Sequence, residues 1–236
     1  LGSNIRYTVP MKVTLATGIY PPDIGGPATY VRGLAHALQK MQVQVQVITY
    51  GKGKSGDDLF PVIRVPKGVL PIVRWFRFAS ALRRHAADSD IIYAFSSVSV
   101  GMPLWITHLK HPKKILRLGG DFRWERYTDK GGSLGLKEWY EKEERFHGAM
   151  NGLLKTFDHI VFSTEFQQSL YEKAYRALPL HNVIENALPG GMPTHHAKHA
   201  PFKLLFLGRF VPFKNIGSLL CAVKNLPDVT LTIVGD

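Results

Sequence analysis

Residues 18–26 form a loop whose composition suits the binding of a phosphorylated ligand. The loop follows a short apolar run and contains Pro21, Pro22 and the pair Gly25-Gly26. Glycines let a ligand or a neighbouring backbone segment approach closely. The free amides of the helix expected to follow favour phosphate or carboxylate. The alternative interpretation is that the two glycines only make a tight turn.

Arg209 and Lys214 form a second candidate site, directly after the apolar run at 203–207. The pattern places both side chains on a loop between a strand and a helix, at the edge of the sheet where ligands bind. Two cations there suit a diphosphate, because Arg binds as a fork and Lys as a point charge. The alternative is an ordinary solvated basic loop.

The common nucleotide-binding motifs are not found at these two loops. The loop at 18–26 contains no G-x-G-x-x-G, and no G-x-x-x-x-G-K-[ST] occurs in the chain. The second expected strand is followed by Lys52 and Lys54 rather than by the acidic residue that would hold a ribose. The sequence therefore gives little support to NAD binding or to nucleoside-triphosphate chemistry.

An alternation of strand and helix patterns positions both loops. Apolar, β-prone runs predict strands, and the spacing of apolar residues within 31–38 predicts a helix after the first loop. Thr164 and Gln167 predict the capping box of another helix. The order predicts an α/β fold with a Rossmann-like parallel sheet and flanking helices. The expected strands span 11–17, 43–49, 62–65, 90–94, 114–118, 159–162 and 183–185, and longer helices span 70–87 and 134–156.

A change of composition predicts a domain boundary. Residues 187–201 are rich in Pro, Gly and His and read as a linker between a domain at 11–186 and the start of a second domain at 202–236. The strands expected at 203–207 and 230–234, with a helix at 215–224, form a single β-α-β unit that cannot cover its own sheet. We therefore expect an incomplete second Rossmann-like unit, whose open sheet edge favours a dimer.

The composition is that of a folded protein with anionic partners. The 236 residues are 45% hydrophobic and carry a net charge of +12. The only cysteine is Cys221, and no signal peptide or membrane-spanning run is found, which predicts a cytoplasmic protein. Residues 1–4 read as a cloning remnant. No nucleic-acid-binding motif accompanies the basic cluster at 110–117, so nucleic acid is not expected as a partner.

No metal is expected from the sequence. The histidines of the linker, His195, His196 and His199, lack a matching set of Cys or carboxylate ligands, and we interpret them as incidental.

The helix expected at 70–87 combines basic and aromatic residues. One predicted face is apolar, with Ile72, Trp75, Phe76, Ala79 and Leu82, and the other is basic. The residues expected to face an anionic membrane surface are Arg74, Arg77, Phe78 and Arg84. The alternative is a surface helix packed on the sheet.

Four segments together resemble retaining family-four glycosyltransferases of the two-Rossmann-domain (GT-B) type. The stretch at 20–38, with its Y-P-P and G-G, resembles their opening, and I-E-N-A at 184–187 resembles the segment before their interdomain linker. L-F-L-G-R followed by K-N-I, at 205–216, is similar to the start of their donor domain. L-T-I-V-G-D at 231–236 is similar to the strand that follows there.

The resemblance implies transfer of a sugar from a nucleotide-diphosphate sugar to a hydroxyl acceptor with retention, without a metal cofactor. Arg209 and Lys214 would hold the diphosphate, and Gly25 and Gly26 would approach it from the other domain. The acceptor, lipid-linked or a polysaccharide, would bind mainly to the first domain, and the enzyme would act at the inner face of the membrane. The expected acceptor-side residues are Gly119, Gly120 and Asn186.

The chain departs from the family pattern in two places. Gly119 stands where many members carry a His near the reacting sugar, and the following G-D-F-R-W-E resembles a variant form. Asp121 is therefore a candidate catalytic residue, or it caps and orients the following turn. The acidic E-x7-E segment of the family lies beyond Asp236. A non-catalytic Rossmann-like module that binds a phosphorylated ligand or an anionic surface is the alternative function.

Overall fold

The computed structural model describes residues 10–53, 58–68, 70–142, 147–187 and 202–235. The chain divides into two compact units, each described by itself below. The first unit is Leu1–Phe122 with Tyr140–Glu185, and the second is Arg123–Trp139 with Asn186–Asp236.

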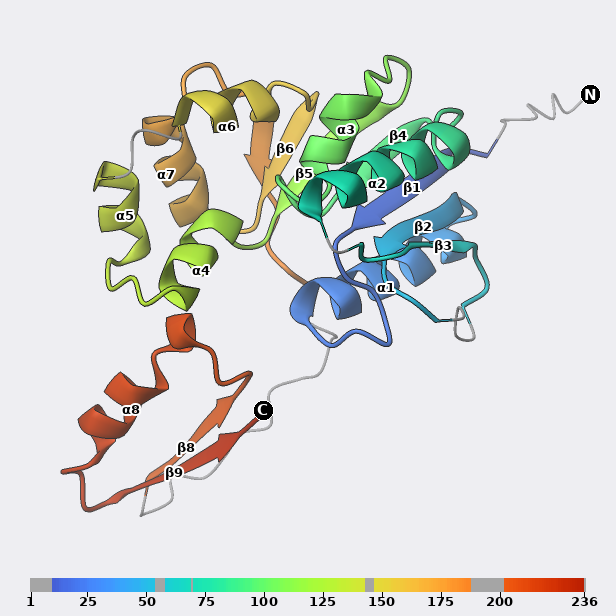
Figure 1. The fold of residues 1–236 in the computed structure, drawn as a ribbon. Helices are drawn as coiled ribbons and strands as arrows, with labels where there is room; N and C mark the ends of the chain where they lie inside the picture. Colours follow the sequence, from blue (N-terminus) through green and yellow to red (C-terminus); the bar gives the residue numbers. More distant parts are fainter. Residues whose placement is uncertain (1–9, 54–57, 69, 143–146, 188–201, 236) are drawn as a thin grey trace, which may run out of the picture. The chain divides into compact units, whose positions relative to one another are not determined.

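A seven-stranded, fully parallel sheet forms the centre of the first unit (Figure 1). Its order is β3-β2-β1-β4-β5-β6-β7. The predicted Rossmann-like parallel sheet is thereby confirmed. The strands are β1 (Lys12–Thr17), β2 (Gln44–Tyr50), β3 (Val62–Val65), β4 (Ile91–Ala94), β5 (Lys113–Leu118), β6 (His159–Phe162) and β7 (Leu180–Val183). The last of these begins three residues earlier than predicted, because Leu180 pairs with His159 of β6.

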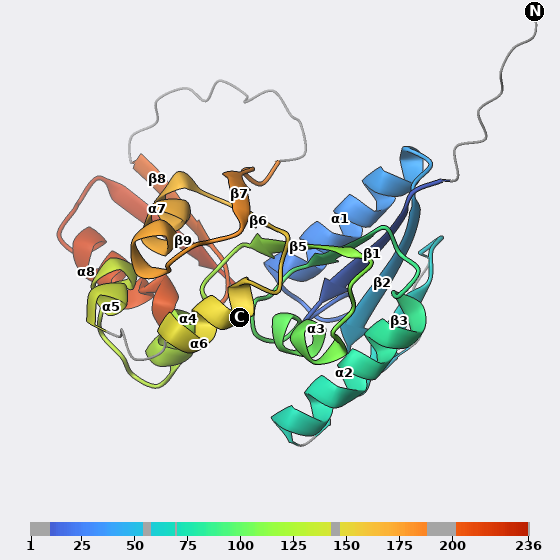
Figure 2. The ribbon, with the colours of Figure 1, turned by 90° about the horizontal axis from the view of Figure 1, so that it is seen from above.

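Helices cover both faces of this sheet. Figure 2 shows α1 on one face and α2 with α3 on the other. The long helix predicted at 134–156 corresponds to two helices, and residues 143–146 between them lie outside the described part of the chain. The helices of the first unit are α1 (Gly26–Lys40), α2 (Pro71–His85), α3 (Gly101–Thr107), α6 (His147–Leu154) and α7 (Glu165–Ala174). Helix α4 (Phe122–Asp129) belongs to the second unit from Arg123 on, and α5 (Leu136–Lys142) is divided between the units after Trp139.

The sheet is buried because both of its faces are covered. Five of the six residues of β1 are buried, as are all residues of β2 after Gln44. The strands therefore read as continuous apolar runs. Buried polar side chains in these strands are hydrogen-bonded. The Gln46 amide donates to Thr14 Oγ1 at 2.7 Å, and Thr14 and Ser89 share a hydrogen bond of 2.7 Å. Burial of these groups is tolerated because they are paired.

The predicted cap of α7 is present. The Gln167 backbone amide donates to Thr164 Oγ1 at 3.1 Å. The side chain of Gln167 contacts Ser163 instead of completing the box.

The second unit holds a two-stranded parallel sheet with helix α8, together with the segment Arg123–Trp139, which contains most of α4 and the start of α5. Leu204 and Phe206 of β8 are half-buried, whereas Leu205 and Leu207 on the opposite face are exposed. The exposed face of this small sheet carries Leu205, Leu207 and Val234 beside Lys203, Thr230 and Thr232. The elements are β8 (Phe202–Leu207), the 3-10 turn η2 (Pro212–Lys214), α8 (Ile216–Val223) and β9 (Val229–Val234).

Candidate functional site

The carboxyl ends of the seven parallel strands share one edge of the sheet in the first unit. Along the strand order, β2 and β3 lie on one side of β1, and β5 to β7 lie beyond β4. The direction of winding reverses between β1 and β4, and in open α/β sheets ligands bind outside the strand ends at such a point. The loop after β1, residues 18–25, lies there.

Gly25 and Gly26 join this loop to α1. Gly26 is the first residue of α1, and Pro27 lies in its first turn. No side chain caps this helix, and its first turn contains no acidic residue. A Cβ added to Gly26 would meet nothing within 4 Å. Pro27 has no N–H, and the Ala28 amide donates to the Gly25 carbonyl at 3.0 Å. The amide at the start of this fifteen-residue helix that can meet an anionic group is therefore that of Gly26. The ligand-binding role of the two glycines stays a prediction.

A buried carboxylate holds the loop after β1 to the rest of the unit. The Asp58 side chain is only 3% exposed. It accepts hydrogen bonds from the Tyr20 hydroxyl at 3.0 Å and from Arg32 Nε at 2.9 Å, and His36 Nε2 lies at 3.4 Å. Burial raises the pKa of Tyr20, and the Asp58 carboxylate raises it further. Asp58 was not predicted, since it lies in a polar stretch without periodicity.

Two more cations fix the same loop. The Arg64 guanidinium, from edge strand β3, donates to the Pro21 carbonyl and lies 5.8 Å from the Tyr20 ring centroid. Lys67 Nζ forms an ion pair with Asp23 at 2.8 Å. The loop is therefore positioned by side chains before any ligand arrives, as preorganised binding requires.

A G-x-G-x-x-G pattern does occur at residues 51–56, after β2, and was overlooked in the sequence. The dinucleotide fingerprint needs a helix directly after the glycines. Here the next element is strand β3, which begins at Val62. Residues 54–57 lie outside the described part of the chain. The pattern therefore lacks the structural context of the fingerprint.

The segment after β5 places Asp121 in a tyrosine cluster. The carboxylate is 7% exposed; it accepts a hydrogen bond from the Tyr171 hydroxyl at 3.1 Å and a short one from the Tyr140 hydroxyl. Burial, with the neighbouring Asp121 and Tyr175, raises the pKa of both tyrosines. This geometry favours the orienting role. The catalytic role of Asp121 stays a prediction.

Gly119 and Gly120, by contrast, are exposed at the carboxyl edge. Beneath them, Arg117 is 3% exposed, stacks 4.8 Å from the Tyr30 ring centroid and donates to the Ile184 carbonyl at 2.9 Å. Arg117 thus holds the chain just before the exposed Asn186, which belongs to the second unit. The burial of Arg117 removes it from the basic surface cluster that the sequence suggested at 110–117.

Arg209 and Lys214 lie where the sequence places them, between β8 and α8. Arg209 follows Gly208 at the carboxyl end of β8, and Lys214 ends the turn η2. Both residues are exposed. Lys214 Nζ lies 5.5 Å from the Phe213 ring centroid. Two exposed cations at this edge can neutralise a diphosphate. They belong to the second unit and Gly25-Gly26 to the first, so their convergence on one ligand stays a prediction.

The prediction that Phe78 is exposed among arginines is wrong. Phe78 is fully buried, and its ring centroid lies 4.4 Å from that of Tyr50. The helix presents residues 75, 78, 79 and 82 to the sheet, a second stripe with helical spacing that overlaps the predicted one. Arg74 is half-buried over the Tyr50 ring. Only Arg77 and Arg84 of the four predicted membrane-facing residues are fully exposed.

The described residues contain neither a candidate metal site nor a candidate membrane-spanning helix. No group of three or more His, Cys, Asp or Glu side chains there is placed to hold a metal ion. No helix in the described ranges is long and apolar enough to cross a membrane. The linker histidines lie outside these ranges.

A family model described as a glycosyl transferase 4-like domain matches residues 25–179. This range contains the start of α1, Asp58 and the Asp121 cluster. No curated protein sequence matches the chain.

Three of the solved structures with the same fold are the following. Sucrose-phosphate synthase from Thermosynechococcus elongatus has 17% identity and a TM-score of 0.69, covering 95% of this chain and 62% of its own. HepE of Anabaena, in complex with UDP and glucose, has 15% identity and a TM-score of 0.66, with coverage of 96% and 61%. The catalytic domain of starch synthase IV from Arabidopsis thaliana, bound to ADP and acarbose, has 12% identity and a TM-score of 0.61, with coverage of 96% and 68%.

At these identities the likeness shows the fold, which is that of GT-B proteins. The chain spans about three fifths of the length of the first two structures.

Proposed function

The chain belongs to the glycosyl transferase 4-like domain family, and we propose that it acts in the transfer of a sugar from a nucleotide-diphosphate sugar to a hydroxyl acceptor with retention of configuration. Its first unit would bind the acceptor, and its second would begin the donor site. The observation that carries the proposal is the exposed pair Arg209 and Lys214 at the carboxyl end of β8. Similar structures with bound UDP or ADP support a nucleotide-diphosphate donor.

The proposed reaction defines what these residues must do. The bond between the anomeric carbon and the diphosphate oxygen breaks, and the acceptor oxygen bonds to that carbon while its proton is released. Negative charge develops on the leaving diphosphate. Arg209 and Lys214 stabilise that charge by fixed electrostatic interaction, so the proposal includes no metal ion. The positive end of the α1 helix dipole, at Gly26, would add partial positive charge.

We propose that the acceptor is lipid-linked or a polysaccharide and lies along the carboxyl edge of the first unit, beside the exposed Gly119 and Gly120. Asn186 would contact it from the start of the second unit. The enzyme would then work in the cytoplasm, at the inner face of the membrane.

Calorimetric titration with UDP, GDP, ADP and their sugar conjugates tests the proposal. We expect the Arg209→Ala, Lys214→Ala double variant to bind the diphosphate at least roughly 30-fold more weakly, because each charged contact contributes about 1–2 kcal/mol. The matched control removes two other exposed cations of the same unit, Lys203→Ala with Lys224→Ala, and should bind like the unchanged chain.

Equal losses in both double variants would show a general charge effect and overturn the assigned site. Binding of simple phosphorylated compounds that survives the Arg209 and Lys214 substitutions would favour the alternative, a non-catalytic module for phosphorylated ligands.

A further inference from the structure

Arg74 differs from the other arginines that are buried or half-buried in the first unit. Each of the others donates to an acceptor of the protein: Arg32 to Asp58, Arg64 to the Pro21 carbonyl and Arg117 to the Ile184 carbonyl. Arg74 is half-buried, and no group of the described residues accepts a hydrogen bond from its side chain or forms an ion pair with it. Its Nε is buried without a partner. Because buried donors are as a rule hydrogen-bonded, this one indicates that an acceptor is missing.

The Arg74 side chain lies at the carboxyl edge of the sheet. Its guanidinium carbon is 5.5 Å from the centroid of the Tyr50 ring, and Tyr50 is the last residue of β2. The Tyr50 hydroxyl donates at 2.8 Å to the carbonyl of Ser99, in the loop between β4 and α3. A Cβ added to Gly18, directly after β1, would lie 3.0 Å from Ser99 Oγ. The ends of β1, β2 and β4 therefore meet near Arg74, where the direction of winding reverses and ligands bind in such sheets.

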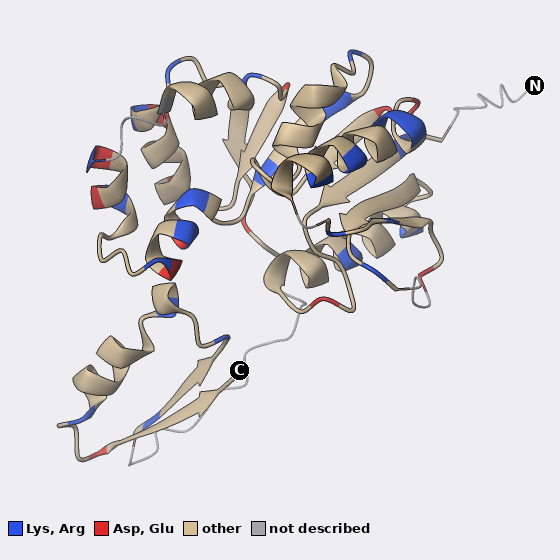
Figure 3. Cartoon of the chain, in the orientation of Figure 1, with Lys and Arg blue, Asp and Glu red and all other residues tan. Residues whose placement is uncertain are grey.

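The ring of Tyr50 holds the Arg74 cation without neutralising it. Tyr50 is buried, and its ring centroid lies 4.4 Å from that of the buried Phe78, so the ring is fixed by packing. A cation over an aromatic face keeps its full charge. Helix α2 contains no acidic residue, and Lys and Arg gather along it in Figure 3. Arg74 is thus a positioned cation that can bind an anion with little reorganisation.

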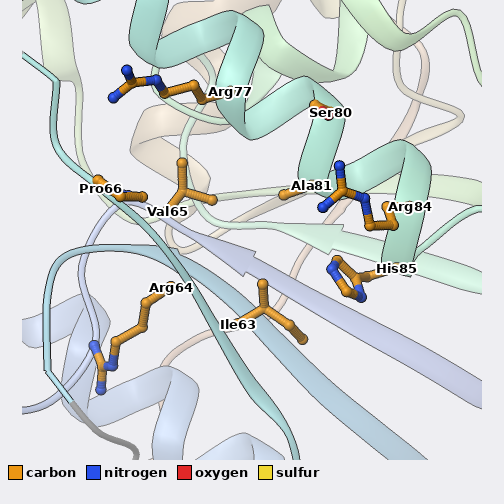
Figure 4. A pocket seen from close by; sticks show the side chains of 9 residues that line it. All are labelled: Ile63, Arg64, Val65, Pro66, Arg77, Ser80, Ala81, Arg84 and His85. Carbon is orange, nitrogen blue, oxygen red and sulfur yellow. The ribbon is translucent and has the colours of Figure 1, made fainter.

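Other cations of α2 line a groove beside edge strand β3 (Figure 4). The groove has a volume of about 350 Å³, and its lining includes Arg77, Arg84 and His85 but not Arg74. Figure 4 shows Arg84 and His85 extending from the helix toward the strand. Arg77 and Arg84 are exposed, so water solvates their charges and neither requires a ligand. These two arginines therefore provide a matched control on the same helix.

We propose that Arg74 binds a phosphate or carboxylate group of the sugar acceptor, so that the acceptor is an anionic compound. A planar guanidinium binds either oxyanion through two parallel hydrogen bonds. A neutral acceptor would leave Arg74 unpaired, and sites with unpaired buried donors reject such analogues. The identity of the ligand as the acceptor rests on the proposed sugar transfer, whereas the anion subsite can be tested without a sugar donor.

Calorimetric titration of the chain in the absence of nucleotides tests this subsite. The probes are glucose 1-phosphate and glucuronate, with glucose as their neutral match and inorganic phosphate as an anion without a sugar. We expect at least one anionic sugar to bind roughly tenfold or more tightly than either glucose or inorganic phosphate, because charge-assisted hydrogen bonds are the strong ones. Arg74→Gln should abolish this preference, and Arg74→Lys should retain part of it because the charge remains.

The matched control, Arg77→Gln with Arg84→Gln, removes two exposed cations from α2 and should bind the anionic sugars like the unchanged chain. Circular dichroism melting should show all variants folded. The proposal is overturned if glucose binds as tightly as both anionic sugars, if inorganic phosphate binds as tightly as glucose 1-phosphate, or if the control loses as much affinity as Arg74→Gln. Failure of the proposed function would be distinguishable, because it would appear as nucleotide binding that does not depend on Arg209 and Lys214.

Discussion

The carboxylate of Asp121 is the residue whose environment constrains its role most closely. Two tyrosine hydroxyls donate to it in a buried site. Both hydroxyls donate to the same oxygen, Oδ2, so an asparagine could still accept these bonds but would carry no charge. Hydrogen bonds to a charged group contribute about 1.5–3 kcal/mol, more than those to a neutral group. Asp121→Asn should therefore lower the free energy of unfolding by about 2–3 kcal/mol in urea titration. Asp129→Asn, an exposed residue at the end of α4, should change it by less than about 0.5 kcal/mol.

The same variant separates the two roles considered for Asp121. If the residue only orients its segment, Tyr171→Phe should reproduce part of the stability loss. A variant that keeps its stability but loses sugar transfer in an active enzyme would instead identify Asp121 as catalytic and contradict the orienting role. The sequence alone left these roles open, because a G-D-x-x-W-E motif does not show that Tyr140 and Tyr171, 19 and 50 residues away, meet the carboxylate.

The loop after β1 shows how one element depends on others. Asp58 binds Tyr20 from the loop and Arg32 from α1, and its side chain is almost entirely buried. Asp58→Asn keeps the shape and removes the charge, so we expect a loss of about 2 kcal/mol in the free energy of unfolding. Any ligand bound at Gly25 and Gly26 should also bind more weakly, because the loop is no longer fixed.

The matched control for this prediction is Asp88→Asn. Asp88 forms a 2.7 Å ion pair with Lys12, and this contact holds the pKa of Asp88 below its usual value. Its side chain is 73% exposed, so solvent screening limits what the pair contributes. A urea midpoint lowered equally by both substitutions would contradict the special role of Asp58.

Strands and helices whose sequence shows one hydrophobic pattern could be predicted. Those whose sequence fits two competing hydrophobic patterns could not. The strands of the sheet read as apolar runs, and their positions follow from the sequence within a few residues. The spacing in α2 supports two overlapping stripes, one with Phe76 and one with Phe78, and only packing on β2 selects the second. Helix α3 escaped prediction because Pro103 suggests a loop, although proline is tolerated in a first helical turn.

Side-chain contacts between segments far apart in the sequence could not be predicted, for a different reason. The contacts from Asp58, Arg64 and Arg117 depend on which strands become neighbours, and no local pattern records that choice. A candidate site at the strand ends could therefore be predicted from the sequence, while the residues that fix its loops needed the sheet order.

At the scale of the whole molecule, we expect the exposed face of the β8–β9 sheet to determine the oligomeric state of the chain in solution. Leu205 and Leu207 are 68% and 74% exposed on a sheet of only two strands, and such a sheet is marginal without a cover. In solution we expect a second copy to cover this face, because the exposed leucines of two copies can pair about a two-fold axis. Light scattering coupled to gel filtration should then give the mass of a dimer.

Leu205→Ser with Leu207→Ser should weaken that dimer at least roughly 100-fold, since four leucine side chains leave a two-fold interface at about 1 kcal/mol or more each. The control, Leu220→Ser with Leu226→Ser, removes two leucines that are each 50% exposed elsewhere in the unit and should leave the mass unchanged. A monomer at all concentrations would show that this face needs no cover from a second copy. A dimer lost equally in both double variants would place the contact outside the β8–β9 face. The proposed diphosphate site would be unaffected in either case, because Arg209 and Lys214 lie at the strand ends rather than on the face of the sheet.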